Sequence, residues 1–138
     1  MRVFQFAFLG DKNSPHLPHN YINNSVAYTG THDNNTLLGH IWECDANTRK
    51  RVLNYCGYEQ KDDNDIDGGY DKIFETMFKS SAGLVIFPIQ DLLLYGSDTR
   101  LNTPGTATGN WRVRFTKEQI LGIDKNKFLK YNELYSRI

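Results

Sequence analysis

The sequence is poor in cysteine, in net charge and in long apolar runs. Cys44 and Cys56 are its only cysteines, too few for a secreted disulfide scaffold, so we expect two reduced thiols in a cytoplasmic protein. Sixteen Lys and Arg balance sixteen Asp and Glu, and this balance leaves no long-range field to attract nucleic acid or an anionic membrane. No apolar run of about 18 residues and no charged-then-apolar leader is present, so neither a membrane span nor a signal peptide is predicted.

The length and composition predict one folded segment over residues 1–138. A mass of 15.9 kDa implies a folded surface of roughly 7,300 Å², against roughly 23,000 Å² for the unfolded chain. Apolar residues make up 39% of the chain and aromatic residues 13%. A core of this size needs neither a metal nor a disulfide.

Short apolar runs alternate with segments that have helical spacing. The expected strands are residues 3–9, 25–28 and 83–89, and the expected helices are residues 36–44, 46–56 and 70–79. The third run is almost wholly apolar, as expected for a strand covered on both faces. Thr116–Gln119 reads as a helix capping box, and apolar residues between 128 and 138 indicate a last helix or turn. The order predicts a parallel α/β sheet.

Three strands are too few to close such a sheet or to shield its edges. The chain is therefore expected to oligomerise or to be part of something larger. Exposed strand edges invite pairing with other chains, so we also expect self-association or a rearranged end to the chain.

A polar cluster follows the second expected strand and precedes a helix. It reads T-G-T-H-D-N-N-T over residues 29–36, and polar residues at the carboxyl ends of strands build sites in α/β folds. Asp33 and His32 suit the stabilisation of positive charge, the binding of a sugar hydroxyl or the binding of a metal. The alternative is that Asp33 or Asn34 only caps the following helix.

A second polar cluster follows the third strand. It begins I-Q-D-L-L at residue 89 and continues through residues 96–105, and two such loops in one chain support a shared site. Trp111 suits stacking on a sugar or a base, or packing in the core. Residues 63–68 match the start of a calcium loop, but Phe74 stands where its last ligand belongs, which favours a solvated acidic turn. His16 and His19 are attributed to a surface loop, and no metal site is predicted.

Six motifs in order give the sequence a resemblance to a known family. They are M-R-V-F-Q-F-A-F, L-P-H-N-Y, V-A-Y-T-G-T-H-D-N, P-I-Q-D-L-L, N-T-P-G and G-N-W-R, between residues 1 and 112. Together they closely resemble the C-terminal part of 4-α-glucanotransferase, also called amylomaltase or disproportionating enzyme. Only the region of residues 49–69 is not distinctive.

This resemblance implies a fold and an activity. The fold would be the C-terminal part, about three βα units, of a TIM (β/α)₈ barrel. The activity would be the transfer of α-1,4-glucan and maltooligosaccharide segments by a retaining double displacement, which needs a nucleophilic carboxylate and an acid/base carboxylate but no cofactor. Asp33 would be the third carboxylate, which orients the sugar and stabilises the transition state. His32 would bind sugar hydroxyls, and Asn102 would lie near the donor sugar.

The resemblance also implies what this chain does not contain. The family's nucleophile and acid/base belong to motifs upstream of M-R-V-F-Q-F, so the chain alone is expected to be inactive. The family often has aspartate at the position of Asn35, which leaves that residue without an implied role. A non-catalytic maltooligosaccharide-binding module is the alternative function, and a calcium-binding protein using Asp63, Asp65 and Asp67 is a remote one.

Overall fold

A sheet of three parallel strands forms the centre of the computed structural model, which describes all of residues 1–138. β1 is Arg2–Val3, β2 is Val26–Tyr28 and β3 is Leu84–Ile86, in the order β1-β2-β3. Ala27 of β2 lies opposite both Arg2 and Val85. The predicted α/β class with a parallel sheet is confirmed.

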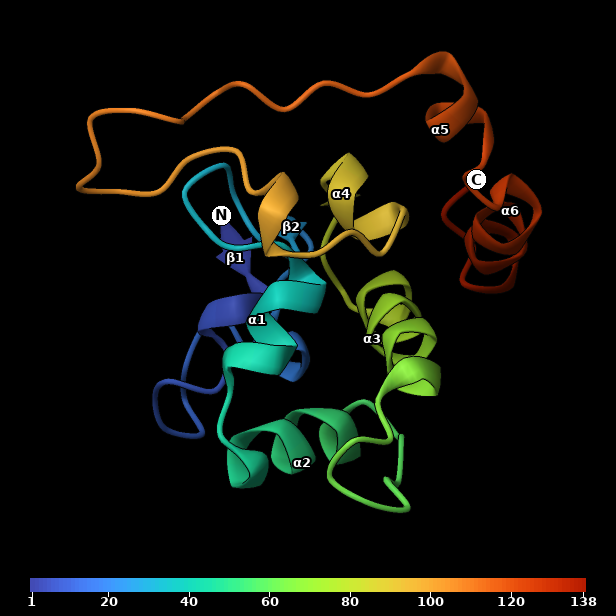
Figure 1. Ribbon diagram of the computed structural model, residues 1–138. Helices are drawn as coiled ribbons and strands as arrows, with labels where there is room; N and C mark the ends of the chain where they lie inside the picture. The colour runs from blue at the N-terminus through green and yellow to red at the C-terminus, as the bar shows by residue number, and fades with distance from the viewer.

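Six α-helices accompany the sheet (Figure 1). They are α1 (Leu37–Glu43), α2 (Ala46–Tyr55), α3 (Asp67–Lys79), α4 (Ile89–Leu92), α5 (Lys117–Leu121) and α6 (Lys125–Leu134), with short 3₁₀ turns at Phe4–Phe6, Pro18–Asn20 and Ser97–Thr99. The expected helices correspond to α1, α2, α3, α5 and α6. α4 was not expected, because four residues are too few to show helical periodicity.

Local capping explains where these helices begin and end. The Thr36 hydroxyl accepts a hydrogen bond from Gly39 N at the start of α1, and the Asp45 carboxylate accepts one from Thr48 N at the start of α2. Gly57 follows α2 with a φ of +88°, a conformation that glycine adopts without a steric cost. The predicted capping box at the start of α5 is present in full.

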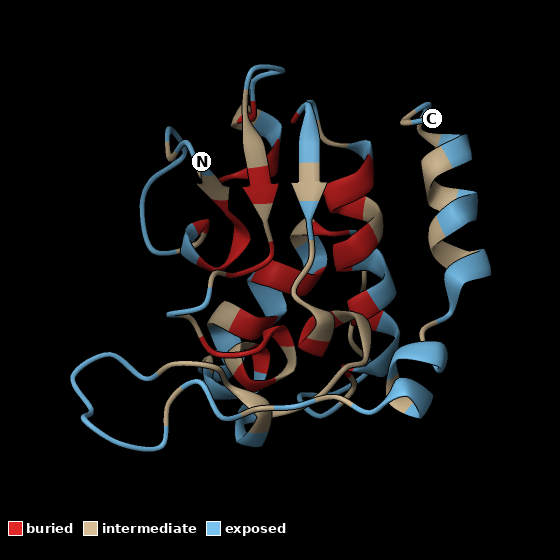
Figure 2. Ribbon diagram, turned by 90° about the horizontal axis from the view of Figure 1, so that it is seen from above, coloured by how far each residue is buried: buried red, intermediate tan, exposed pale blue.

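The core lies between the sheet and helices α1 to α3 (Figure 2). Ala27 from β2 and Phe4 after β1 join the apolar faces of the three helices in one buried cluster. Val85 of β3 packs against the same cluster. The residues that alternate with Ala27 and Val85 therefore point away from this core.

The strand expected over residues 3–9 was wrong beyond Val3. After β1 the chain turns into a 3₁₀ helix at Phe4–Phe6. Phe4 enters the core, and Gln5, also buried, donates from its backbone N to Thr29 O and from its side chain to Asn35 O. These contacts bend the chain beneath the loop that follows β2.

The expectation that β3 is covered on both faces is also wrong for this chain. Leu84 and Ile86 are 52% and 41% exposed, on the face opposite the core. The accessible surface is 8162 Å², larger than the roughly 7,300 Å² that a compact monomer of this mass exposes. One apolar face of the sheet is thus left open.

The C-terminal helices lie outside this core. No residue of α5 or α6 is buried, and α6 packs against α3 through Phe128 on Phe74 and through an ion pair between Lys127 and Asp71. Cys44 and Cys56 are free thiols. None of the helices combines the length and the apolar character needed to cross a bilayer.

Candidate functional site

The two polar clusters of the sequence meet at the carboxyl end of the sheet. Figure 1 shows the loop after β2 beside the segment that follows α4. They line a cleft of about 610 Å³ with the ends of β2 and β3. Its lining residues include His32, Asp33, Gln90, Asp91 and Arg100.

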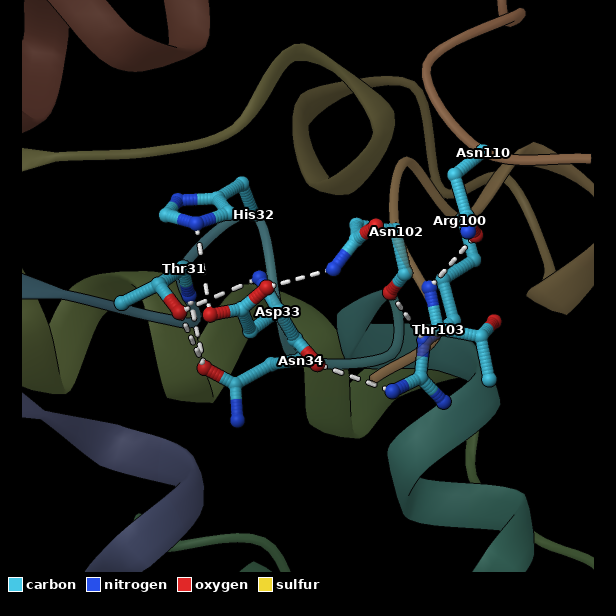
Figure 3. Close-up of polar contacts among 8 residues, drawn as sticks. All are labelled: Thr31, His32, Asp33, Asn34, Arg100, Asn102, Thr103 and Asn110. Atoms are coloured by element: carbon cyan, nitrogen blue, oxygen red, sulfur yellow. Dashed lines mark hydrogen bonds and ion pairs between the residues drawn. The ribbon is translucent and has the colours of Figure 1, made fainter. Parts of the chain in front are cut away.

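Asp33 presents its carboxylate to the cleft and is 51% exposed (Figure 3). Oδ1 accepts a hydrogen bond of 2.7 Å from Asn102 Nδ2, and Oδ2 lies 3.3 Å from His32 Nε2. The structure therefore brings together all three site residues singled out in the sequence. The hydrogen bond from Asn102 directs this carboxylate, and a directed carboxylate suits electrostatic stabilisation of a positive charge.

Arg100 joins the two loops at this point. Its terminal Nη2 donates to Asp33 O at 2.8 Å, and its Nε donates to Asn102 O at 3.0 Å (Figure 3). The guanidinium thus fixes the backbones of both residues and keeps Asn102 beside Asp33. The sequence indicated no role for Arg100, because both of its partners are backbone oxygens and Asp33 is 67 residues away.

Trp111 adds an aromatic surface beside His32. The ring centroids are 5.2 Å apart with planes inclined by 34°, and Trp111 is 61% exposed. The loop that carries it is closed by a hydrogen bond from Trp111 N to Leu101 O and by Asn110, which accepts from Thr103 N. Of the two interpretations of Trp111, packing in the core is wrong, and an exposed aromatic face is available for stacking.

Neither Asp33 nor Asn34 caps α1. Thr36 is the cap, while Asn34 Oδ1 accepts hydrogen bonds from Thr31 N and Thr31 Oγ1 inside the loop. Asn34 therefore shapes the turn, and the Asp33 carboxylate remains available to the cleft.

The Asn35 side chain connects its loop to neighbouring elements. Its buried side chain donates to Glu43 Oε1 at 2.7 Å and to Ser97 Oγ at 2.9 Å. A Cβ at Gly39 would lie 2.6 Å from Asn35 Oδ1, so the helix must pass this side chain without one. Asn35 ties the loop to α1 and to the segment after α4.

The remaining candidates from the sequence lie elsewhere. Asp65 accepts from the Tyr58 hydroxyl and from Lys61 N, so its carboxylate serves a local turn. His16 Nδ1 accepts from Val3 N, and His19 Nδ1 pairs with the Tyr55 hydroxyl. No group of three His, Cys, Asp or Glu side chains is placed to hold a metal ion.

Asp91 is a buried acid among the residues of the cleft. It is 1% exposed, and burial raises its pKa from 3.8 to about 6, although hydrogen bonds from Leu37 N and Thr29 Oγ1 act in the opposite direction. The sequence placed Asp91 in a polar cluster but gave no sign that its side chain would be buried.

Comparison with known proteins assigns the chain to a family. A family model described as 4-alpha-glucanotransferase matches residues 1–119. The chain belongs to the 4-alpha-glucanotransferase family. It is 41% identical over 99% of its length to a 4-alpha-glucanotransferase of Synechocystis, covering 26% of that protein, and 36% identical over its whole length to a chloroplastic or amyloplastic one of Arabidopsis thaliana, covering 24%.

A solved structure supports the same assignment. The chain superposes on amylomaltase from Streptococcus agalactiae in complex with acarbose with a TM-score of 0.87 and 29% identity. The match covers 99% of this chain and 27% of that one. The chain thus spans about a quarter of the length of these members of the 4-alpha-glucanotransferase family, and its whole site lies within the matched residues 1–119.

Proposed function

We propose that residues 1–138 are the C-terminal part of the catalytic (β/α)₈ barrel of a cytoplasmic 4-α-glucanotransferase. Three parallel strands with helices on one face are what about three βα units of such a barrel would provide. The open face that carries Leu84 and Ile86 would then be the barrel interior, filled by the remaining strands. The quarter-length matches to the relatives support this proposal.

In this proposal Asp33 orients the sugar and stabilises the oxocarbenium-like transition state of a retaining transfer. The observation that carries it is the carboxylate of Asp33 in the cleft, with Asn102 on one oxygen and His32 beside the other. His32 binds sugar hydroxyls, and Asn102 lies near the donor sugar while fixing Asp33. The substrates are α-1,4-glucans and maltooligosaccharides, and this chemistry needs no cofactor.

The chain alone should be inactive. Asp33 and Asp91 are the carboxylates of the cleft, and both oxygens of the buried Asp91 already accept hydrogen bonds. Retaining transfer needs a nucleophile and a separate acid/base. We place those two groups in the part of the relatives that this chain does not cover.

A hybrid enzyme tests this proposal. The matching quarter of the Synechocystis enzyme is replaced by this chain, and maltotriose disproportionation is measured for the hybrid and for the purified chain. We expect an active hybrid and an inactive chain. Asp33→Asn in the hybrid should lower kcat by about a hundredfold to a thousandfold, whereas the matched exposed change Asp63→Asn should leave it unaltered.

Three results would contradict the proposal. Transfer by the purified chain would refute its inactivity, and a folded but inactive hybrid would refute its place in the barrel. Equal rates for Asp33→Asn and Asp63→Asn would refute the role of Asp33.

The alternative is a module that binds maltooligosaccharides without catalysis. It is favoured by the fact that Asp33, Asn102, Arg100 and Trp111 are held in place by contacts within this chain. Acarbose binding by the purified chain together with an inactive hybrid would select this alternative.

A further inference from the structure

Both ends of the loop that carries Asp33 are fastened to one buried side chain. Thr29, directly after β2, donates from Oγ1 to Asp91 Oδ2 at 2.5 Å. Leu37, the first residue of α1, donates from its backbone N to Asp91 Oδ1 at 2.8 Å. His32 and Asp33 lie on the segment between these two points.

Asp91 can keep its hydrogen bonds with Thr29 and Leu37, which we call the attachment, whether its carboxyl group is ionised or protonated. An ionised carboxylate accepts both hydrogen bonds. When Asp91 is protonated, its hydroxyl can donate to Thr29 Oγ1, while the other oxygen still accepts from Leu37 N. The attachment therefore persists whether or not Asp91 carries a charge.

Burial of the ionised Asp91 carboxylate is offset by two hydrogen bonds but by no ion pair. No ion pair of the structure involves Asp91, so no cation compensates the buried acid. An unpaired buried acid is destabilising in its charged form. Such departures from good core chemistry gather at functional sites.

Gln90, the neighbour of Asp91 on α4, contacts the loop that carries Arg100 and Asn102. Gln90, also buried, donates from Nε2 to Thr99 O, next to Arg100. Arg100 in turn holds Asp33 O and Asn102 O. One short helix thus supports both loops that meet at Asp33.

We propose that Asp91 is a positioning residue, which sets where Asp33 and His32 stand by fixing Thr29 and Leu37. This inference rests on the proposed function, since it assumes that Asp33 and His32 meet the sugar. Asp91 itself does not touch the substrate, because both of its oxygens are occupied and its side chain is buried.

Matched variants of the chain test the inference. Thr29→Val and Asp91→Leu break the attachment, and Asp91→Asn preserves it, since the amide oxygen accepts from Leu37 N and the amide nitrogen donates to Thr29 Oγ1. The control is Thr76→Val, which removes another buried hydroxyl, bonded to Lys72 O in α3.

Two quantities are measured at conditions where each variant is folded. The first needs no ligand: the NMR signal of the Asn102 side-chain amide, which reports its bond to Asp33. The second is the Kd for acarbose. We expect Thr29→Val and Asp91→Leu to shift the amide signal toward that of a free asparagine and to weaken acarbose about tenfold, because small displacements of positioned groups are costly.

Asp91→Asn and Thr76→Val should keep both values of the wild type. If Thr29→Val behaves like Thr76→Val in both measurements, Asp91 is merely structural and the inference is wrong. If the wild-type chain binds no acarbose, the binding role fails, while the amide signal still decides whether Asp91 positions Asp33. An Asp91→Leu chain that does not fold leaves the decision to Thr29→Val.

Discussion

The buried acid Asp91 makes the stability of this chain depend on pH in a predictable direction. Its pKa in the folded protein is about 6, above the usual 3.8. The folded state therefore binds this proton more tightly than the unfolded state. The associated stability is fully present below pH 3.8 and is lost as the pH rises through 6.

The size of the effect follows from the difference between the two pKa values. About two pKa units correspond to about 3 kcal/mol. Asp91 is almost fully buried, so water does not screen this contribution. His16 and His40 act in the opposite sense, because burial lowers the pKa of each and charging them at low pH opposes folding. The total pH profile of the wild type thus mixes several groups.

Replacing Asp91 by asparagine isolates its contribution. Urea unfolding is measured for the wild type and for Asp91→Asn between pH 3.5 and 7.5. The free energy of unfolding of Asp91→Asn, relative to the wild type, should increase by about 3 kcal/mol across this range. A relative change below about 1 kcal/mol would refute the reasoning, since it would mean that Asp91 titrates as an exposed acid does.

Two further predictions concern the C-terminal end and the open face. Arg137 donates to the carbonyl oxygens of Phe78, Ser80 and Ala82 at the end of α3, so Arg137→Ala should cost about 2 kcal/mol in urea unfolding; a loss no larger than that of the exposed Arg114→Ala would contradict this. The open face of β3 should make the chain self-associate in light scattering, and Leu84→Lys should restore a monomer of 15.9 kDa whereas Leu9→Lys, on an exposed turn, should not. A wild-type monomer at high concentration would contradict the second prediction.

Local signals in the sequence predicted most of the helices. The Thr116 capping box and the Gly57 helix end depend on residues a few positions apart, and both are present. The turn after Val3 was not predictable in this way. It depends on hydrogen bonds from Gln5 to Thr29 and Asn35, which no short pattern reveals.

Burial was the quantity that sequence patterns judged least well. The apolar run over residues 83–89 has the composition of a strand covered on both faces, yet Leu84 and Ile86 are exposed because this chain supplies a cover for one face only. The apolar composition of this strand suits burial on both faces, but its actual exposure depends on which neighbouring elements pack against it.

Some residues of the site could be singled out from motifs in the sequence, whereas others could be recognised only in the folded structure. Asp33 and His32 became candidates because they follow a strand, and polar residues after parallel strands meet at one edge of the sheet. Their expected roles came from the resemblance to the family. Asp91 escaped notice because an acid after a strand resembles an ordinary helix start until its depth is known. The residues that line the cleft can thus be read from their order in the chain. The residue that holds them in place can be recognised only by its partners, one at each end of the same loop.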